Sequence, residues 1–202
     1  MNIDKTLHNL QTRGFKTNYL KNEQEALDYI KKLIPTSASV GFGGSMTVVD
    51  LNLHNILNER GNTVYHTAIN PNNLPNTQLY KLSYSADWFV TSCNALTETG
   101  ELIYIDGNAN RIGNVVNGAP NVVVVAGINK ITPDIASGID RVRNVASPLN
   151  ARRLKRNTPC ATLNKCTFCN SPDCMCNATL ILHHPTARRN FYIVLVDKSL
   201  GY

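Results

Sequence analysis

The sequence predicts an α/β fold: one mostly parallel sheet with helices on both faces. Two observations carry this prediction. Short β-compatible apolar runs alternate with segments of helical periodicity, and residues 121–127, NVVVVAG, are apolar without interruption. A strand covered on both faces has this uniform character, and repeated strand–helix alternation favours parallel pairing. A chain of 202 residues suits a single core, so we expect one domain over residues 1–202.

The first part of the chain is expected to be helical. Apolar residues at helix-like spacing run through residues 3–33 with a break near Gly14, and Pro35 ends the second helix. Residues 37–42, SASVGF, then form a short strand that ends in glycines. Ser45 is positioned to cap the helix that follows, so this region is predicted to be a strand, a glycine turn and a helix.

The same alternation continues along the chain. Strands are expected at residues 62–66, 87–92 and 121–127, and helices at residues 76–86, 111–119 and 132–147, the last with Thr132 as its cap and Pro133 at its first position. Residues 100–106, GELIYID, form an additional strand or hairpin arm. Residues 179–184 and 189–202 are apolar and β-rich, so they should add strands to the preceding sheet.

Composition argues against several classes of protein. The chain is 43% apolar and 17% charged, and no apolar run approaches the roughly 20 residues that cross a bilayer. The N-terminal residues lack the apolar core of a secretory signal, so we expect a cytoplasmic location, in which disulfides are disfavoured.

The net charge of +6 is concentrated locally. One cluster comprises Arg152, Arg153, Lys155 and Arg156, and a pair comprises Arg188 and Arg189. No nucleic-acid-binding motif accompanies these residues, so nucleic-acid binding is disfavoured. The cluster either contacts a ligand or partner or forms a solvated face, whereas for the pair the solvated face is favoured.

Three loops follow buried strands and should meet at one edge of the sheet, because parallel sheets bind ligands beyond the carboxyl ends of their strands. The first loop, within VGFGGSMT, offers Gly41, Gly43, Gly44 and Ser45 as anion-binding residues. Backbone N–H groups and a hydroxyl are suitable donors to a phosphate or carboxylate. The pattern matches neither the nucleotide P-loop nor the dinucleotide fingerprint, so a tight turn without a ligand is the alternative.

The second loop, CNALTETGE, supplies Asn94 as a ligand-binding residue and Glu98 as a nucleophile or general base. The alternatives are a capped turn for Asn94 and a surface charge for Glu98. The third loop ends in Lys130, a catalytic candidate whose ammonium would steer or neutralise an anion. Cys93 is expected to be a small core residue.

A glycine-bounded turn near the second loop, IDGNANRIG, adds Asn108 and Arg111 as ligand-binding candidates. The guanidinium of Arg111 can clamp a carboxylate through two hydrogen bonds. The alternative is that Arg111 forms a structural pair with Asp106.

Five of the six cysteines lie within 17 positions, in the spacing C-x5-C-x2-C-x4-C-x-C. They are Cys160, Cys166, Cys169, Cys174 and Cys176. The surrounding segment, residues 150–178, is polar and lacks helical or strand periodicity, so a bound metal would supply the stability that its apolar content does not. Four thiolates suit an iron–sulfur cluster, which we favour, or a zinc ion; free redox-sensing thiols are the remaining alternative.

Several segments together closely resemble one known family. They are EALDYIKKLIPTSASVGFGGSMTVVDLNL, SADWFVTSCNALTETGELIYIDGNANRIGNVVNGAPNVVVVAGINKI, RVRNVASPLNARRL, TPCATLNKCTFCNSPDCMC and IVLVDKSLGY. The family is LUD, the domain of bacterial lactate utilisation proteins. The resemblance covers nearly the whole chain, and it looks like the single-domain branch that carries a C-terminal cysteine segment.

The resemblance implies a fold related to ribose-5-phosphate isomerase, glucosamine-6-phosphate deaminase and coenzyme A transferases, which bind phosphate or acyl-thioester ligands near a comparable glycine loop. It also implies association with the oxidation of L-lactate to pyruvate, alongside iron–sulfur redox partner proteins. Members of this branch tend to show Ser-Pro-Asp-Arg-Ile-Cys where this chain has SPDCMC at residues 171–176. Cys174 is then the additional thiol, and the expected metal ligands are Cys160, Cys166, Cys169 and Cys176.

Two functions are consistent with these features. One is an enzyme or enzyme subunit that binds a small anionic metabolite at the three loops, with an electron-transferring 4Fe–4S cluster nearby. The other is a non-catalytic zinc-binding or regulatory component of a redox complex. The sequence leaves open which one holds, which substrate is bound and whether the chain forms a homo-oligomer.

Overall fold

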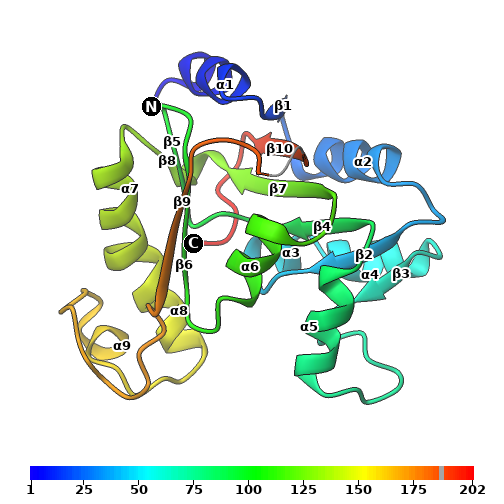
Figure 1. The fold of residues 1–202 in the computed structure, drawn as a ribbon. Helices are drawn as coiled ribbons and strands as arrows, with labels where there is room; N and C mark the ends of the chain where they lie inside the picture. Colours follow the sequence, from blue (N-terminus) through cyan, green and yellow to red (C-terminus); the bar gives the residue numbers. More distant parts are fainter. Residues whose placement is uncertain (187–188) are drawn as a thin grey trace.

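A parallel sheet of six strands lies at the centre of the computed structural model, which describes residues 1–186 and 189–202 (Figure 1). Its order is β1-β10-β7-β4-β2-β3, and each neighbouring pair is parallel. The strands are β1 (Lys16–Leu20), β2 (Ser39–Phe42), β3 (Thr63–Tyr65), β4 (Trp88–Thr91), β7 (Asn121–Gly127) and β10 (Asn190–Val196). The carboxyl ends of β2, β4, β7 and β10 therefore lie along one edge.

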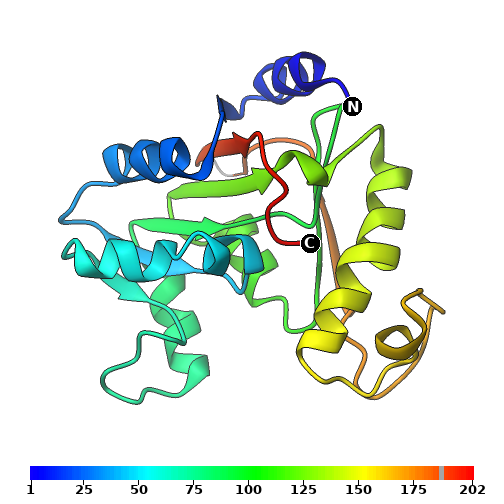
Figure 2. The same ribbon diagram turned by 180° about the vertical axis from the view of Figure 1, so that it is seen from behind.

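Helices cover both faces of this sheet, which confirms the predicted fold class. Successive side chains of a strand point to opposite faces. In β7, Val123 and Val125 pack in one core cluster with α2 (Glu23–Leu33), α3 (Met46–Asp50) and α4 (Leu53–Glu59). Val122 and Val124 pack in another with α1 (Ile3–Thr12) and α6 (Asn110–Asn117). Figure 2 shows α3 and α4 in front of the sheet, and Figure 1 shows α6 and α5 (Asn76–Tyr84) in front of its other face.

A second, four-stranded sheet was not expected from the sequence. Its order is β8 (Ile131–Thr132), β5 (Ala95–Thr97), β6 (Leu102–Asp106) and β9 (Ala178–Leu182). β6 is antiparallel to both β5 and β9. The prediction that residues 179–184 extend the main sheet is therefore wrong, whereas β10 does enter it. The second sheet packs against the helical run formed by α7 (Ile135–Arg141), a π-helical turn (Val142–Ala146) and α8 (Ser147–Arg153).

Four local predictions differ from the structure. Residues 16–20, expected within a helix, form β1 because Gly14, with φ of +91°, ends α1 and the chain then pairs along β10. Asp134 rather than Thr132 caps α7, since its side chain accepts a hydrogen bond from the Ser137 N–H at 2.8 Å. The helix expected to stop at Ser147 continues as α8, and α9 (Pro159–Leu163) lies inside the cysteine segment. No helix within residues 1–186 and 189–202 is both long and apolar enough to span a membrane.

Candidate functional site

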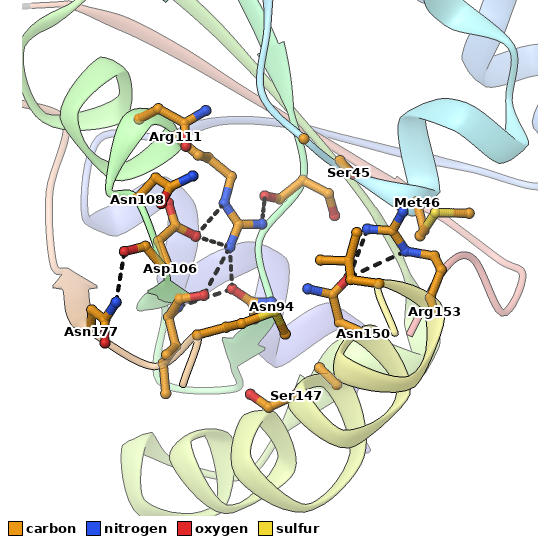
Figure 3. A pocket seen from close by; sticks show the side chains of 18 of the residues that line it. Ser45, Met46, Asn94, Asp106, Asn108, Arg111, Ser147, Asn150, Arg153 and Asn177 are labelled. Atoms are coloured by element: carbon orange, nitrogen blue, oxygen red, sulfur yellow. Dashed lines mark hydrogen bonds and ion pairs between the residues drawn. The ribbon is translucent and has the colours of Figure 1, made fainter. Parts of the chain in front are cut away.

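A cavity of about 500 Å³ opens at the carboxyl edge of the six-stranded sheet. We call it the anion cavity, after the anionic ligand that the sequence predicts for these loops. Its walls come from the loops after β2, β4 and β6, from the ends of α8 and of the cysteine segment, and from Tyr202. Figure 3 shows part of this wall, with Ser45, Asn94 and Arg111 facing Asn150 and Arg153 of α8. The three loops expected to meet do so here, because Gly44, Asn94 and Lys130 all line the cavity.

The three glycines of the first loop have different environments. A Cβ on Gly41 would lie 2.2 Å from the Oγ and 2.8 Å from the Cα of Ser83, so Gly41 allows α5 to pack closely on β2. A Cβ on Gly43 would lie 2.9 Å from Thr91 Oγ1, so this glycine also permits close packing. Within the described residues, no atom lies within 4 Å of the position of a Cβ on Gly44, and Gly44 alone of the three lines the cavity. Only Gly44 therefore lies where a ligand would approach.

Ser45 lines the cavity and also caps α3, as expected. Its Oγ accepts a hydrogen bond from the Val48 N–H at 3.4 Å, and its own hydroxyl proton stays available for another acceptor. The cap fixes the position of the Ser45 side chain at the cavity wall.

Lys130 is a cation that is only 3% exposed and that lines the anion cavity. Its Nζ donates to Thr47 Oγ1 and Ser92 Oγ at 2.8 Å and to the Cys93 carbonyl at 3.2 Å. Burial lowers the pKa of Lys130 from 10.5 to about 8. Across the described part of the chain, no carboxylate lies within 4.0 Å of this Nζ. The positive charge is therefore hydrogen-bonded but not neutralised.

Arg111 adopts the structural pair with Asp106. Its Nε donates to Asp106 Oδ1 at 3.0 Å and its Nη2 donates to Asn94 Oδ1 at 2.5 Å (Figure 3). The second oxygen of Asp106 accepts from the Ile112 N–H at 3.0 Å. The pair is buried, so Arg111 fixes Asp106 and Asn94 in the wall, and Asn108 lines the cavity beside them.

Two members of the basic cluster, Arg153 and Arg156, line the anion cavity, which agrees with the ligand alternative for these two. Arg153 donates from Nη2 to Asn150 Oδ1 at 2.8 Å and from Nε to Tyr202 Oη at 2.7 Å, and Arg156 lies 3.8 Å from Asp173. The lining side chains thus include four cations, Lys130, Arg111, Arg153 and Arg156, and two carboxylates, Asp106 and Asp173. This excess of positive charge favours an anionic ligand.

Comparison with known proteins decides the family. The sequence model of the LUD domain matches residues 3–196. The chain belongs to the LUD domain family. A crystal structure of a DUF162 family protein from Deinococcus radiodurans is similar, with a TM-score of 0.54, over 97% of this LUD chain and 99% of that chain. The identity is 14%, so this similarity shows the fold alone. A search of curated proteins found no match.

Glu98 of this LUD domain lies outside the anion cavity. Its carboxylate accepts hydrogen bonds from the Asn2 N–H at 2.8 Å and from Lys5 Nζ at 3.3 Å, so it anchors α1 to the turn between β5 and β6. The hydrogen bond from Asn2 is the main cause that lowers the pKa of Glu98. The physical reason for this placement is that β5 leaves the sheet edge and enters the second sheet. The structure therefore does not bring Glu98 together with Lys130.

One member of the arginine pair, Arg189, differs from the expected solvated face. Arg188 lies outside the described residues. Arg189 donates from Nε to the Ala119 carbonyl at 2.7 Å and from Nη1 to the Val115 carbonyl at 2.6 Å. It therefore satisfies carbonyl groups at the C-terminal end of α6, a structural role that the sequence did not indicate.

A further part of the wall, not predicted from the sequence, comes from the end of β3 and from α5 and includes Tyr65, His66 and Tyr80. The His66 ring lies 4.4 Å from the His54 ring between centroids, and burial lowers the pKa of His66 to about 4. His66 is therefore uncharged at neutral pH. Its Nδ1 accepts from the Ala68 N–H at 3.2 Å, which places the ring proton on Nε2. No local motif marks these residues, because only the fold brings an edge strand and a helix to the cavity.

All five clustered cysteines line a second cavity of about 230 Å³, which we call the thiol cavity. Its sulfurs have polar neighbours: the Phe168 N–H donates to Cys166 at 3.4 Å, the Cys176 N–H donates to Cys174 at 3.4 Å, and Arg143 Nη1 lies 3.8 Å from Cys166. Phe168 adopts the left-handed conformation, with φ of 50°, and this turns the chain between Cys166 and Cys169. Such donors stabilise thiolates that bind a metal centre.

The five thiols line the thiol cavity, but they do not converge on one position in the described residues. In the described ranges, no three side chains of His, Cys, Asp or Glu lie close enough together to hold one metal ion. A tetrahedral zinc site needs four sulfurs about 2.3 Å from a common centre, so these cysteines would have to move inward to bind zinc. Thiolates are the donors for zinc and for iron–sulfur clusters alike, so the chemistry of the lining suits either centre, although the described residues are not assembled around one.

Proposed function

We propose that this LUD-domain protein binds a small anionic metabolite in the anion cavity and takes part in the oxidation of L-lactate to pyruvate. The observation that carries the proposal is Lys130, a buried cation that lines the cavity and has no carboxylate partner among the described residues. Lactate and pyruvate are both carboxylates, and either would neutralise this charge. Membership of the LUD family supports the assignment to lactate utilisation.

The residues of the chain have separate parts in this proposal. Lys130 compensates the charge of the bound carboxylate, and Gly44 leaves room for it to approach the backbone. Ser45 and Asn108 offer further polar contacts, whereas Arg111 positions Asn94 and Asp106 in the wall. Glu98 has no part, because it is occupied at the end of α1.

A 4Fe–4S cluster in the thiol cavity is the second part of the proposal. Cys160, Cys166, Cys169 and Cys176 would hold it, with Cys174 as the additional thiol. When bound, the cluster would supply electron transfer, and iron–sulfur partner proteins would exchange electrons with it. The N–H groups and Arg143 beside the sulfurs support thiolate ligands at this position.

One observation favours the alternative, a non-catalytic zinc-binding or regulatory component. Both carboxylates among the described lining residues are paired with arginines, Asp106 with Arg111 and Asp173 with Arg156. Proton acceptance during lactate oxidation would then be left to His66, whose pKa of about 4 makes it a weak base at pH 7. A protein that binds lactate or pyruvate without turnover would therefore agree with this alternative.

Two measurements test the proposal. Protein purified without oxygen should be brown, contain about four iron and four sulfide ions per chain, and bleach on reduction. Colourless protein with stoichiometric zinc would rule out the cluster and leave the zinc alternative. Calorimetric titration should detect binding of lactate or pyruvate, and failure of both carboxylates to bind would contradict the anion site.

Thiol modification distinguishes the cysteines one by one. In native metal-free protein, an alkylating reagent should modify the five clustered cysteines but not Cys93, which is 1% exposed. After metal loading, Cys174 alone should react, because the four expected ligands are protected. Mass spectrometry of the digested protein measures both patterns. Protection of Cys174 together with reaction of Cys160 or Cys169 would show that the ligand set is different.

A further inference from the structure

The anion cavity and the thiol cavity share a wall. Three residues, Ser147, Cys174 and Met175, line both of them. Cys174 is the one clustered cysteine that also lines the anion cavity. The fifth thiol, which a four-ligand metal centre does not need, is thus the thiol that lines both cavities.

Direct contacts join this shared wall to the anion-binding residues. The position of a Cβ on Gly107 lies 3.4 Å from the Met175 Cα, so the loop after β6 packs closely on Met175. Asn177 donates from its backbone N–H to the Asp106 carbonyl and from Nδ2 to the Gly107 carbonyl, both at 3.0 Å (Figure 3). Asp106 in turn holds Arg111. On the opposite side, Cys176 Sγ donates to Ser147 Oγ of α8 at 3.5 Å.

The segment that carries the shared wall has no regular secondary structure of its own. Residues 164–177 contain no helix or strand, and the cysteines within them are only partly buried. Phe168, the aromatic residue between Cys166 and Cys169, is 75% exposed rather than packed in a core. A segment of this kind gains its fixed conformation largely from a bound metal.

We propose that metal binding in the thiol cavity fixes the wall formed by Cys174 and Met175, so that occupancy of either cavity raises the affinity of the other. This inference rests on the proposed function. Coupling between binding sites is reciprocal, so the metal must strengthen anion binding by the same factor by which the anion strengthens metal binding. Couplings between distinct sites are commonly about 5- to 150-fold.

The experiment uses the full chain, with sulfate and Zn²⁺ as probes. Zn²⁺ is suitable because its exchange with a competing chelator is reversible and gives an affinity. Calorimetry measures sulfate binding to the metal-free and the Zn²⁺-loaded protein, and chelator competition measures Zn²⁺ binding with and without sulfate. We expect both affinities to rise by the same factor, at least about 5-fold.

Two variants locate the coupling. Met175→Ala removes a side chain from the shared wall, so Zn²⁺ and sulfate should still bind while the coupling factor falls toward one. Thr167→Ala is the matched control, because Thr167 lines the thiol cavity but not the anion cavity, and it should keep the full factor.

The outcomes separate this inference from the proposed function. If both probes bind and each affinity is independent of the other probe, the coupling is overturned while the two sites stand. Loss of coupling in both variants would overturn the assignment to the shared wall. If sulfate binds neither form, the anion site of the proposed function falls and the coupling falls with it. If Zn²⁺ does not bind, the coupling is overturned, and the anaerobic spectrum and iron content decide the 4Fe–4S cluster separately.

Discussion

The lowered pKa of Lys130 predicts how anion binding depends on pH. Lys130 is protonated below about pH 8, so sulfate should bind there and lose affinity as the pH rises through that value. Lys130→Met should weaken sulfate binding at least about 10-fold, since hydrogen bonds and contacts to a charged group contribute about 1.5–3 kcal/mol. It should also remove the dependence on pH near 8. Calorimetry between pH 6 and pH 9.5 measures both effects, and an unchanged pH profile in the variant would assign the dependence to another group.

The same pKa shift affects folding. The unfolded chain holds the Lys130 proton up to a pKa of 10.5 and the folded chain only to about 8, so the unfolded state binds more protons between these values. The free energy of unfolding should therefore gain a contribution that rises with pH across this window. Urea denaturation of the wild type and of Lys130→Met at pH 7.5 and pH 9.5 tests it: the difference between the two proteins should change in favour of the wild type at the higher pH.

The position of Lys130 after a buried strand could be predicted from the sequence. Its burial could not, because its hydrogen-bond partners Thr47 and Ser92 lie 83 and 38 positions away in the chain. Glu98 was chosen on the same ground, but it lies in the turn between β5 and β6, where it contacts α1. A residue that follows a strand can be found from the sequence alone, whereas its burial and its hydrogen-bond partners depend on distant segments.

For Glu98, unlike Lys130, we expect a substitution to leave anion binding unchanged. Glu98→Gln should leave the affinity for sulfate unchanged, because the carboxylate lies at the end of α1 and not in the anion cavity. It should loosen α1, which hydrogen exchange of the α1 amide groups would detect. A large loss of sulfate affinity without unfolding would restore Glu98 to the binding site.

At the scale of helices and strands, the sequence pattern predicted five of the six strands of the main sheet, β2, β3, β4, β7 and β10. It did not predict β1. The reason is physical: β1 has no apolar alternation, and its burial pattern is mostly intermediate or exposed, so its strand conformation comes from pairing with β10. β8, with two residues, and β5, with three, were missed because such short strands are too short to show an alternation of apolar and polar residues.

Substitutions in the loop after β2 can separate the effect of its glycines on stability from their effect on ligand binding. Gly41→Ala should cost about 1–3 kcal/mol in the free energy of unfolding, because the new methyl group would meet Ser83 of α5 at 2.2 Å. Gly44→Ala is the matched control for stability, since its methyl group would enter open space, and its expected effect is weaker sulfate binding. Urea denaturation and calorimetry measure the two properties. Equal stability of both variants would show that α5 can move away from β2 at little cost.

At the scale of the whole molecule, the fold class could be read from the alternation of strands and helices, but the two-sheet arrangement could not. The anion cavity exists because the second sheet, α8 and the cysteine segment stand opposite the carboxyl edge of the first sheet. The local sequence of β9 does not distinguish pairing with β6 from entry into the main sheet. The wall formed by the strand-end loops was therefore predicted, whereas the opposite wall, formed by the second sheet, α8 and the cysteine segment, was not.

Anion binding should stabilise the whole fold, since the cavity joins segments from most of the chain. Sulfate at about 100 times its Kd should add about 2.7 kcal/mol to the free energy of unfolding. For a chain of this length, each kcal/mol raises the thermal midpoint by roughly 2–4 °C. Differential scanning calorimetry with sulfate, and with Lys130→Met as the control that should respond much less, measures the shift. An equal shift in both proteins would point to a general salt effect.

The strand order has a consequence for how the protein is made. Among the strands of the described residues, β10 comes last in the chain and lies between β1 and β7, and β1 pairs with β10 alone. On the ribosome, the first strand must therefore wait until residues 190–196 have emerged before its edge of the sheet can close. Contacts of such long sequence separation slow folding. Until then the exposed edge of β7 and the unpaired β1 are surfaces that a nascent-chain chaperone would protect.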